Sequence, residues 1–496
     1  MATVKEWADS RIIQDEIDRY LPEDGKDFID EDLIEKCLEE QKAPNADYVR
    51  KIIEKSRKLD TLLPEETAAL LNVTDPALIE EMEQAAIDIK LKVYDNRIVT
   101  FAPLYLSSKC INGCTYCSFR EANDDSVRRV LTQDEIDREI KTLAGDIGHK
   151  RLIVVYGEHP DSDANYIKET VKTIYNAKYK TKKGYGQIRR VNINAAPMSI
   201  ADLEVLNEVG IGTYQVFQET YHHKTFNEVH PKNTVKGDFK WRAYAMHRAM
   251  DAGIDDVGIG ALFGLYDWKF EVMGLLLHSR ELEDKYGVGP HTISFPRLEH
   301  AENAPGLEDT KDHHLSDEQF KHAVLCIRLS VPYTGMILTA REDAALRDKI
   351  IPLGITQTDA STKIGLGAYA EESEIQEGDR QQFIVGDTRS LDEVVRSLAK
   401  QGFITSFCTA GYRCGRTGQK ILDALKSGHE GKFCKLNAII TYREWLDDFG
   451  SEETRKIAEP IINREIEQVK ERNPKMYDAL MKYYGRISKG ERDLYF

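Results

Sequence analysis

Apolar and polar residues follow three different patterns along this chain of 496 residues. Up to about residue 90, apolar residues recur at helical spacing among many charged ones, as in IDEDLIEKCLEEQ. From about residue 98, short apolar or β-branched runs alternate with amphipathic stretches of ten or more residues. After about residue 385, long and highly charged helical segments return. The pattern predicts a helical N-terminal extension over residues 1–90, an α/β domain over 91–385 and a mainly helical C-terminal domain over 386–496.

Eight runs in the central part have the length and composition of β-strands. Helix candidates separate them, and strands that alternate with helices form parallel βαβ units. Eight such strands are the number that closes a TIM-type (β/α)8 barrel, which is the predicted fold; an open doubly wound sheet is the alternative. The runs are residues 99–106, 151–157, 189–195, 212–218, 255–261, 290–296, 333–339 and 353–359.

Charge and hydropathy narrow the classes of partner. The formal net charge is -16, which argues against nucleic acid or an anionic membrane as the main partner. The first twenty residues carry charges throughout, and no run approaches the length of about 18 apolar residues that spans a bilayer. We therefore expect a soluble cytoplasmic protein whose main partner is neither nucleic acid nor a membrane.

Three cysteines are clustered directly after the first predicted strand. Cys110, Cys114 and Cys117 occupy the stretch SKCINGCTYCSF, at the end of the strand where barrel enzymes place their chemistry. A structural zinc site needs a fourth ligand, and no histidine lies nearby to supply it. A [4Fe-4S] cluster normally takes four thiolates, so three would leave one iron open to an external ligand.

The spacing Cys-x3-Cys-x2-Cys, with Tyr116 before the last cysteine, resembles the signature of the radical S-adenosylmethionine (radical SAM) enzymes. The resemblance implies a [4Fe-4S] cluster on the three cysteines, with S-adenosyl-L-methionine on the open iron as the source of a 5'-deoxyadenosyl radical. Gly157 and Glu158, in YGEHP, resemble the family segment whose backbone meets the methionyl amine. By the same resemblance, Glu219 is a candidate for the ribose hydroxyls and Arg248 for the methionyl carboxylate.

Longer segments narrow the resemblance to one family of radical SAM enzymes. The chain resembles the HydG family of tyrosine lyases, which mature [FeFe]-hydrogenase, and less closely the ThiH family of 2-iminoacetate synthases. The segments that carry this resemblance are IRRVNINAAP, YGVGPHTISFPR, FCTAGYRCGRTG and the terminal GERDLYF. The resemblance implies cleavage of the Cα–Cβ bond of tyrosine to p-cresol and dehydroglycine, with ferredoxin or flavodoxin as electron donor. Arg341 and Arg297 follow predicted strands, where a guanidinium could bind the carboxylate of an amino acid at two points. Together with Glu219 they are the candidate catalytic residues.

The HydG resemblance also implies a second Fe–S cluster in the C-terminal domain, where dehydroglycine is converted to carbon monoxide and cyanide. The family pattern for it is Cys-x2-Cys-x22-Cys. Cys408 and Cys434 match the outer positions, Gly411 stands at the middle one, and Cys414 is the candidate third thiolate. His291, which we place at the end of the sixth predicted strand, matches a histidine that ligates an extra iron.

These departures leave several functions open. The chain could carry out the whole sequence to carbon monoxide and cyanide, or stop at dehydroglycine as a 2-iminoacetate synthase does. A HydG paralogue that acts on another substrate is a further alternative. The segment TQTDASTKIGLG, which places Asp359 at the substrate mouth, departs from the serine-rich segment of HydG; such departures bear on carbon monoxide and cyanide production more than on tyrosine cleavage. An inert barrel that only carries a cluster is the alternative from a different class.

Overall fold

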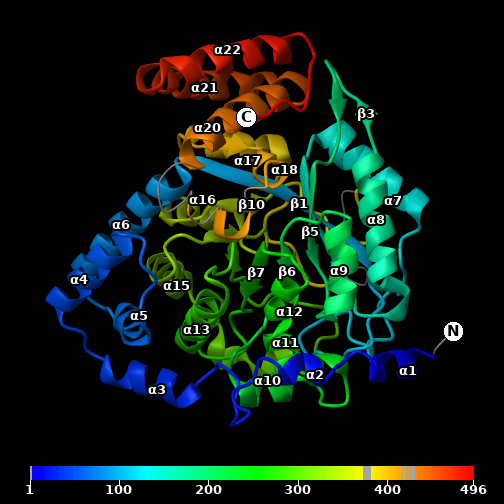
Figure 1. The fold of residues 1–496 in the computed structure, drawn as a ribbon, viewed down its shortest axis with the longest axis vertical. Coiled ribbons are helices and arrows are strands. Elements are labelled where there is room, and N and C mark those ends of the chain that lie inside the picture. Colours follow the sequence, from blue (N-terminus) through cyan, green and yellow to red (C-terminus); the bar gives the residue numbers. More distant parts are fainter. Residues whose placement is uncertain (1–2, 372–380, 416, 421–422, 424–429) are drawn as a thin grey trace.

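Eight parallel β-strands form a closed barrel in the computed structural model, which describes residues 3–371, 381–415, 417–420, 423 and 430–496 (Figure 1). Each strand pairs with the next, and β1 also pairs with β10, which closes the barrel. The predicted (β/α)8 fold is confirmed, and the open sheet is excluded. The strands are β1 (Arg97–Ser107), β2 (Arg151–Tyr156), β5 (Arg190–Asn194), β6 (Tyr214–Gln215), β7 (Val257–Gly260), β8 (Thr292–Ser294), β9 (Gly335–Leu338) and β10 (Gln357–Asp359).

The strand β1 is longer than its neighbours because it has three partners. Residues 99–101 pair with β10, and residues 102–107 pair with β2. The first residues, 97–99, pair with β11 (Ile404–Ser406), a strand from the C-terminal part that the sequence pattern did not predict. Side chains alternate along each strand, and Phe101, Ile153 and Ile337 meet inside the barrel as a small apolar cluster. The barrel interior is therefore filled in its lower part and leaves room above.

Helices surround the barrel between the strands. Their starts follow the capping rules; for example, Ser316 and Gln319 form a capping box at the start of α15. The helices are α7 (Gln133–Ile140), α8 (Ala164–Asn176), α9 (Ile200–Glu208), α10 (His223–Val229), α11 (Phe239–Ala243), α12 (Ala245–Asp251), α13 (Trp268–Tyr286), α14 (Gly306–Asp309), α15 (Asp317–Ser330) and α16 (Ala344–Ile350). A short hairpin of β3 (Tyr179–Lys180) and β4 (Tyr185–Gly186) projects beyond them.

Among the residues that the structure describes, six helices precede β1, in the part for which the pattern predicts a helical extension. The last of them continues to Tyr94, so the expected division after residue 90 falls inside a helix. They are α1 (Val4–Asp9), α2 (Asp15–Asp18), α3 (Glu31–Glu40), α4 (Ala46–Arg57), α5 (Pro64–Leu71) and α6 (Pro76–Tyr94). Arg11, just after α1, pairs with Asp202 at 2.7 Å between Nη1 and Oδ2, which ties the start of the chain to α9.

The part of the chain after β10 is mainly helical. It comprises α17 (Leu391–Lys400), β11, α18 (Ala410–Arg413), α20 (Glu430–Asp448), α21 (Glu452–Arg472) and α22 (Pro474–Ser488). In Figure 1 the last three helices lie at the top of the molecule, and α1 to α3 lie at the opposite end. Within the described residues, no helix is both long and apolar enough to cross a membrane.

Candidate functional site

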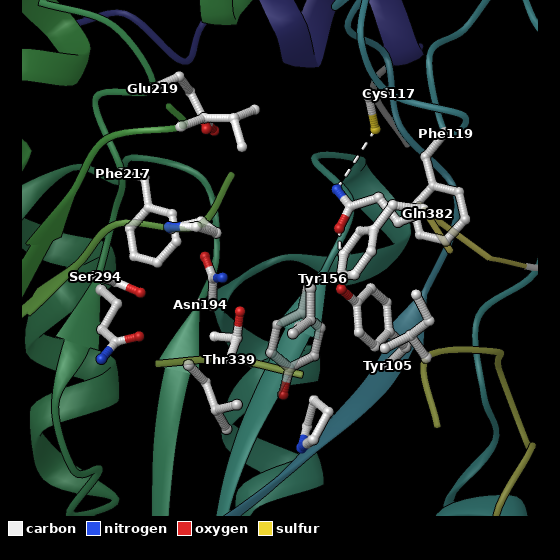
Figure 2. A pocket seen from close by; sticks show the side chains of 18 of the residues that line it. Tyr105, Cys117, Phe119, Tyr156, Asn194, Phe217, Glu219, Ser294, Thr339 and Gln382 are labelled. Carbon is white, nitrogen blue, oxygen red and sulfur yellow. Dashed lines mark hydrogen bonds between the residues drawn. The ribbon is translucent and has the colours of Figure 1, made fainter. Parts of the chain in front are cut away.

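A cavity of about 210 Å³ lies inside the barrel at the carboxyl ends of the strands (Figure 2). Cys110, Cys114 and Cys117 all line it, together with residues from all eight barrel strands or the loops that follow them. In Figure 2, Cys117 and Glu219 stand on opposite sides of this space. The structure thus brings the three-cysteine loop and the predicted substrate end of the barrel into one cavity.

One arginine holds the loop of the three cysteines in place. The guanidinium of Arg128 donates to the carbonyl oxygens of Ser108 (3.0 Å), Phe119 (2.5 Å) and Asn123 (3.2 Å), and also to that of Arg120. A rigid guanidinium that serves four carbonyls fixes the path of the backbone on both sides of the cysteines. Arg128 was not among the residues predicted from the sequence.

The end of β2 packs directly against this loop. A Cβ atom at Gly157 would lie 2.2 Å from the carbonyl oxygen of Lys109, so only glycine fits there. The backbone N–H of Ile111 donates to the carbonyl oxygen of Glu158 at 2.9 Å. The Glu158 carboxylate accepts a hydrogen bond of 2.6 Å from Asn112 Nδ2, and burial raises its pKa. Both predicted residues of this segment, Gly157 and Glu158, line the cavity beside Cys110.

The opposite wall carries a buried group of charges around Glu219. Its carboxylate pairs with Lys236 Nζ at 2.8 Å and with Arg242 Nη2 at 3.3 Å. Burial raises the pKa of Glu219, but the two cations outweigh burial and hold it below its ordinary value. The backbone of Glu219 has φ = +73°, a strained conformation for a residue with a side chain. The site therefore holds an ionised carboxylate and two cations.

Lys236 and Arg242 were missed by the sequence reasoning, which proposed Arg248. Arg248 does not line the cavity: it donates to the carbonyl oxygens of Met198 (2.9 Å) and Trp241 (2.5 Å), and its guanidinium lies 3.6 Å from the Trp241 ring centroid. The geometry therefore does not support a ligand-binding role for Arg248. Arg242, six residues earlier, lines the cavity instead.

The two arginines proposed for the substrate differ in the same way. Arg297 lies outside the cavity lining and is engaged with Glu342, at 2.9 Å between Nε and Oε2, and with Asp317, at 2.9 Å between Nη1 and Oδ1. Arg341 lines the cavity, and its guanidinium lies 3.4 Å from the Phe383 ring centroid. No hydrogen bond or ion pair to the Arg341 side chain is found within the described part of the chain. The structure thus leaves Arg341 able to bind a carboxylate, and Arg297 already paired.

Asp359 ends β10 and also lines the cavity. Its Oδ2 accepts a hydrogen bond of 2.8 Å from Thr362 Oγ1, and its Oδ1 lies 3.4 Å from Arg347 Nη2. Burial raises the pKa of Asp359, and the charge of Arg347 opposes this. Strand pairing sets Thr358 beside Leu338, so Asp359 and Arg341 leave the barrel from neighbouring strands.

A second, smaller pocket of about 100 Å³ lies at the other end of the barrel. Cys408, Cys434, His291 and Gly411 line it. Because β8 begins at Thr292, His291 stands at the amino end of its strand, and its placement at the strand's carboxyl end was wrong. Cys414 is exposed and does not line the pocket; its Sγ lies 4.0 Å from the carbonyl oxygen of Phe496. The structure brings two thiols and an imidazole together there, and not the third cysteine.

The chemistry of the upper cysteines fits an iron–sulfur cluster. Burial raises the pKa of Cys110 and raises that of Cys114 to about 12, although Lys236 opposes the shift at Cys114. Buried thiols of this kind are deprotonated when iron binds them. Within the described ranges, no three His, Cys, Asp or Glu side chains converge as a single metal ion requires. Thiolates of a four-iron cluster each bind a different iron and are spaced more widely, so this finding does not bear on a cluster.

Comparisons with known proteins agree with this site. A profile described as the Radical SAM superfamily matches residues 104–275, and one described as the Biotin and Thiamin Synthesis associated domain matches residues 294–404. A 2-iminoacetate synthase of Escherichia coli (strain K12) is 28% identical over 371 residues, which cover 74% of this chain and 93% of the relative.

Solved structures cover the chain more completely. A crystal structure of HydG, a maturase of the [FeFe]-hydrogenase, is 45% identical and matches with a TM-score of 0.89 over 95% of this chain and 100% of that one. The HydG of Carboxydothermus hydrogenoformans is 34% identical, with a TM-score of 0.75 over 96% and 100% of the two chains.

Proposed function

We propose that this chain, which belongs to the HydG family of radical SAM enzymes, cleaves the Cα–Cβ bond of tyrosine to p-cresol and dehydroglycine. Within the family, a radical SAM domain implies a [4Fe-4S] cluster and S-adenosyl-L-methionine. When bound, this pair supplies a 5'-deoxyadenosyl radical after one-electron reduction. Cys110, Cys114 and Cys117 would hold the cluster, and a low-potential protein such as ferredoxin or flavodoxin would donate the electron.

The remaining residues of the upper cavity would bind and orient the two small molecules. The backbone of Gly157 and Glu158 borders the cysteine loop, where the amine of S-adenosyl-L-methionine would lie. Glu219 is an ionised acceptor suited to ribose hydroxyls, and Lys236 and Arg242 supply the positive charge for which Arg248 had been proposed. Tyr116 also lines this cavity, and because its hydroxyl lies 2.8 Å from His230 Nε2, its ring rather than its hydroxyl would contact S-adenosyl-L-methionine.

One observation supports the amino-acid substrate most directly. Arg341 lies in the same cavity as the three cysteines, and its guanidinium has no hydrogen bond or ion pair among the residues that the structure describes. Burial lowers its pKa, which means that the charged form lacks solvation and would gain from an anionic partner. A carboxylate bound at two points by this guanidinium would hold the substrate within reach of the cluster end of the cavity.

The reaction can be tested with a matched pair of variants. Reconstituted enzyme with S-adenosyl-L-methionine, dithionite and tyrosine is expected to yield 5'-deoxyadenosine and p-cresol in similar amounts. Arg341→Lys is expected to lower the p-cresol yield at least tenfold while 5'-deoxyadenosine still forms, because a lysine cannot bind the carboxylate at two points. Arg297→Lys should leave the product ratio unchanged. The proposal fails if the wild-type enzyme forms 5'-deoxyadenosine and no p-cresol.

The lower pocket favours a second candidate, an enzyme that releases dehydroglycine as 2-iminoacetate synthases do. The family pattern for the second cluster has three cysteines, whereas here only Cys408 and Cys434 line the pocket and Cys414 is exposed. Dehydroglycine that is released would hydrolyse to glyoxylate and ammonia. Formation of glyoxylate without carbon monoxide or cyanide would support this candidate. Formation of carbon monoxide and cyanide, whether bound to the protein or free, would exclude it.

A further inference from the structure

Residues 381–384 lie beside the loop of the three cysteines and border the upper cavity. On one side, the hydroxyl of Ser118, next to the last cluster cysteine, donates to the carbonyl oxygen of Gln381. On the other, the backbone N–H of Ile384 donates to the carbonyl oxygen of His300 at 2.9 Å. Two side chains between these anchors, Gln382 and Phe383, line the cavity.

Gln382 is hydrogen-bonded to one of the predicted cluster ligands. Its amide nitrogen Nε2 lies 3.5 Å from Cys117 Sγ, and its oxygen Oε1 accepts a hydrogen bond of 2.9 Å from the hydroxyl of Tyr105 (Figure 2). Tyr105 is on β1 and is buried, so the position of its hydroxyl is fixed by the barrel. Because Tyr105 engages the oxygen of the amide, the NH₂ group of Gln382 is turned toward the sulfur.

A donor at this place acts on the cluster electrostatically. Hydrogen bonds to the sulfur atoms are among the factors that set the reduction potential of an Fe–S cluster. The reduced cluster is more negative by one charge, so an N–H directed at Cys117 stabilises the reduced form more than the oxidised one. The potential should therefore be higher with this donor present.

The second amide near the cysteines does not offer the same test. Asn112 Nδ2 lies 3.7 Å from Cys110 Sγ, but the same amide also binds the Glu158 carboxylate at 2.6 Å and the backbone N–H of Lys236 at 2.9 Å. A change there would disturb the loop itself. For Gln382, in contrast, the side-chain bonds found within the described ranges are those to Tyr105 and Cys117.

We infer that Gln382, oriented by Tyr105, is a positioning residue that makes the cluster at Cys117 easier to reduce. The inference rests on the cluster proposed for the three cysteines, and it is independent of the identity of the substrate. It also gives a role to a segment beyond the barrel strands, in which Gln382 touches the cluster end and the neighbouring Phe383 lies against Arg341.

The test is a redox titration of the reconstituted cluster, followed by electron paramagnetic resonance, in the wild type and three variants. In Gln382→Leu the ratio of reduced to oxidised cluster at a fixed potential is expected to fall about tenfold, which for a one-electron couple is about 59 mV. In Tyr105→Phe the same ratio should fall by a smaller factor, because the Gln382 amide loses the hydrogen bond that orients it. The matched control is Gln215→Leu, since Gln215 also lines the cavity but bonds to Thr292 at 3.2 Å.

The outcomes separate this inference from the proposed reaction. Equal ratios in the wild type and Gln382→Leu, with equal iron content, would overturn the inference even if p-cresol forms. The predicted fall would support it even if tyrosine proves to be the wrong substrate. Should Gln382→Leu fail to retain iron, Tyr105→Phe decides, and an unchanged ratio there would overturn the inference.

Discussion

Replacing Gly157 with alanine should push the cysteine loop away from the end of β2. The added Cβ would lie 2.2 Å from the Lys109 carbonyl oxygen, 2.9 Å from its carbonyl carbon and 3.3 Å from Cys110 Cβ. An ordinary C···O contact is about 3.3 Å, so the loop must move by about 1 Å. The backbone cannot separate freely, because the N–H of Gly157 donates to Ser107 and the N–H of Ile111 donates to Glu158, both at 2.9 Å.

This geometry sets the expected cost and its control. Overpacking against a backbone that cannot relax costs about 1–3 kcal/mol, and we expect the upper end of that range for Gly157→Ala. Gly485, in α22, has nothing within 4 Å of an added Cβ, so Gly485→Ala should instead stabilise the protein by about 1 kcal/mol.

Both quantities can be measured on the same preparations. Urea unfolding gives the two free-energy changes, and iron per chain after reconstitution reports whether the three cysteines still converge. Gly157→Ala is expected to take up less iron than the wild type, and Gly485→Ala the same amount. A Gly157→Ala protein with full iron content and unchanged stability would refute the steric reasoning, because it would show that the loop does not rest on this glycine.

Three further predictions concern other parts of the chain. Cys114→Ala should lose the cluster iron, whereas Cys408→Ala should keep the iron content of the wild type because only two cysteines line the lower pocket; a loss of about half in Cys408→Ala would instead reveal a second cluster. Asp359→Asn should raise the KM for tyrosine about tenfold, because a buried carboxylate in the same cavity as Arg341 suits the substrate ammonium. Binding of 3-(4-hydroxyphenyl)propionate, which lacks the ammonium group, should stay unchanged, and equal effects on the two compounds would contradict this role. Burial raises the pKa of Glu271 from 4.5 to about 8, so the folded state keeps a proton that the unfolded state releases, and the free energy of unfolding falls as pH rises through that window. Urea unfolding between about pH 5 and about pH 9 should show a smaller fall for Glu271→Gln than for the wild type, and an identical pH dependence would count against this reasoning.

The fold was predictable because its signals are periodic and local. Eight β-branched runs separated by helices give a barrel, and three cysteines after the first run give a site at the carboxyl end of β1. The run PHTISFP shows the limit of such reasoning, since only Thr292–Ser294 form the strand. A shift of a few residues was enough to move His291 from one end of the barrel to the other.

The choice between nearby arginines depends on facts that no pattern contains. Arg242 and Arg248 lie six residues apart, which is about 240° around a helix, so only one of them can face the cavity, and the packing of α11 and α12 against the barrel decides which. Arg297 is drawn away from the cavity by Glu342, its partner across 45 residues of sequence. Long-range pairing of this kind is set by tertiary packing, which is why Lys236 and Arg242 were missed.

Strand β1 borders both pockets. Val99 lines the lower pocket, and Phe101, two residues later, lines the upper one. At about 3.3 Å per residue, roughly 7 Å of one strand joins the two sites. An inserted or deleted residue would shift both sites at once and turn every later side chain of the strand to the opposite face, so chimaeras that exchange the two ends of this protein should be joined outside β1.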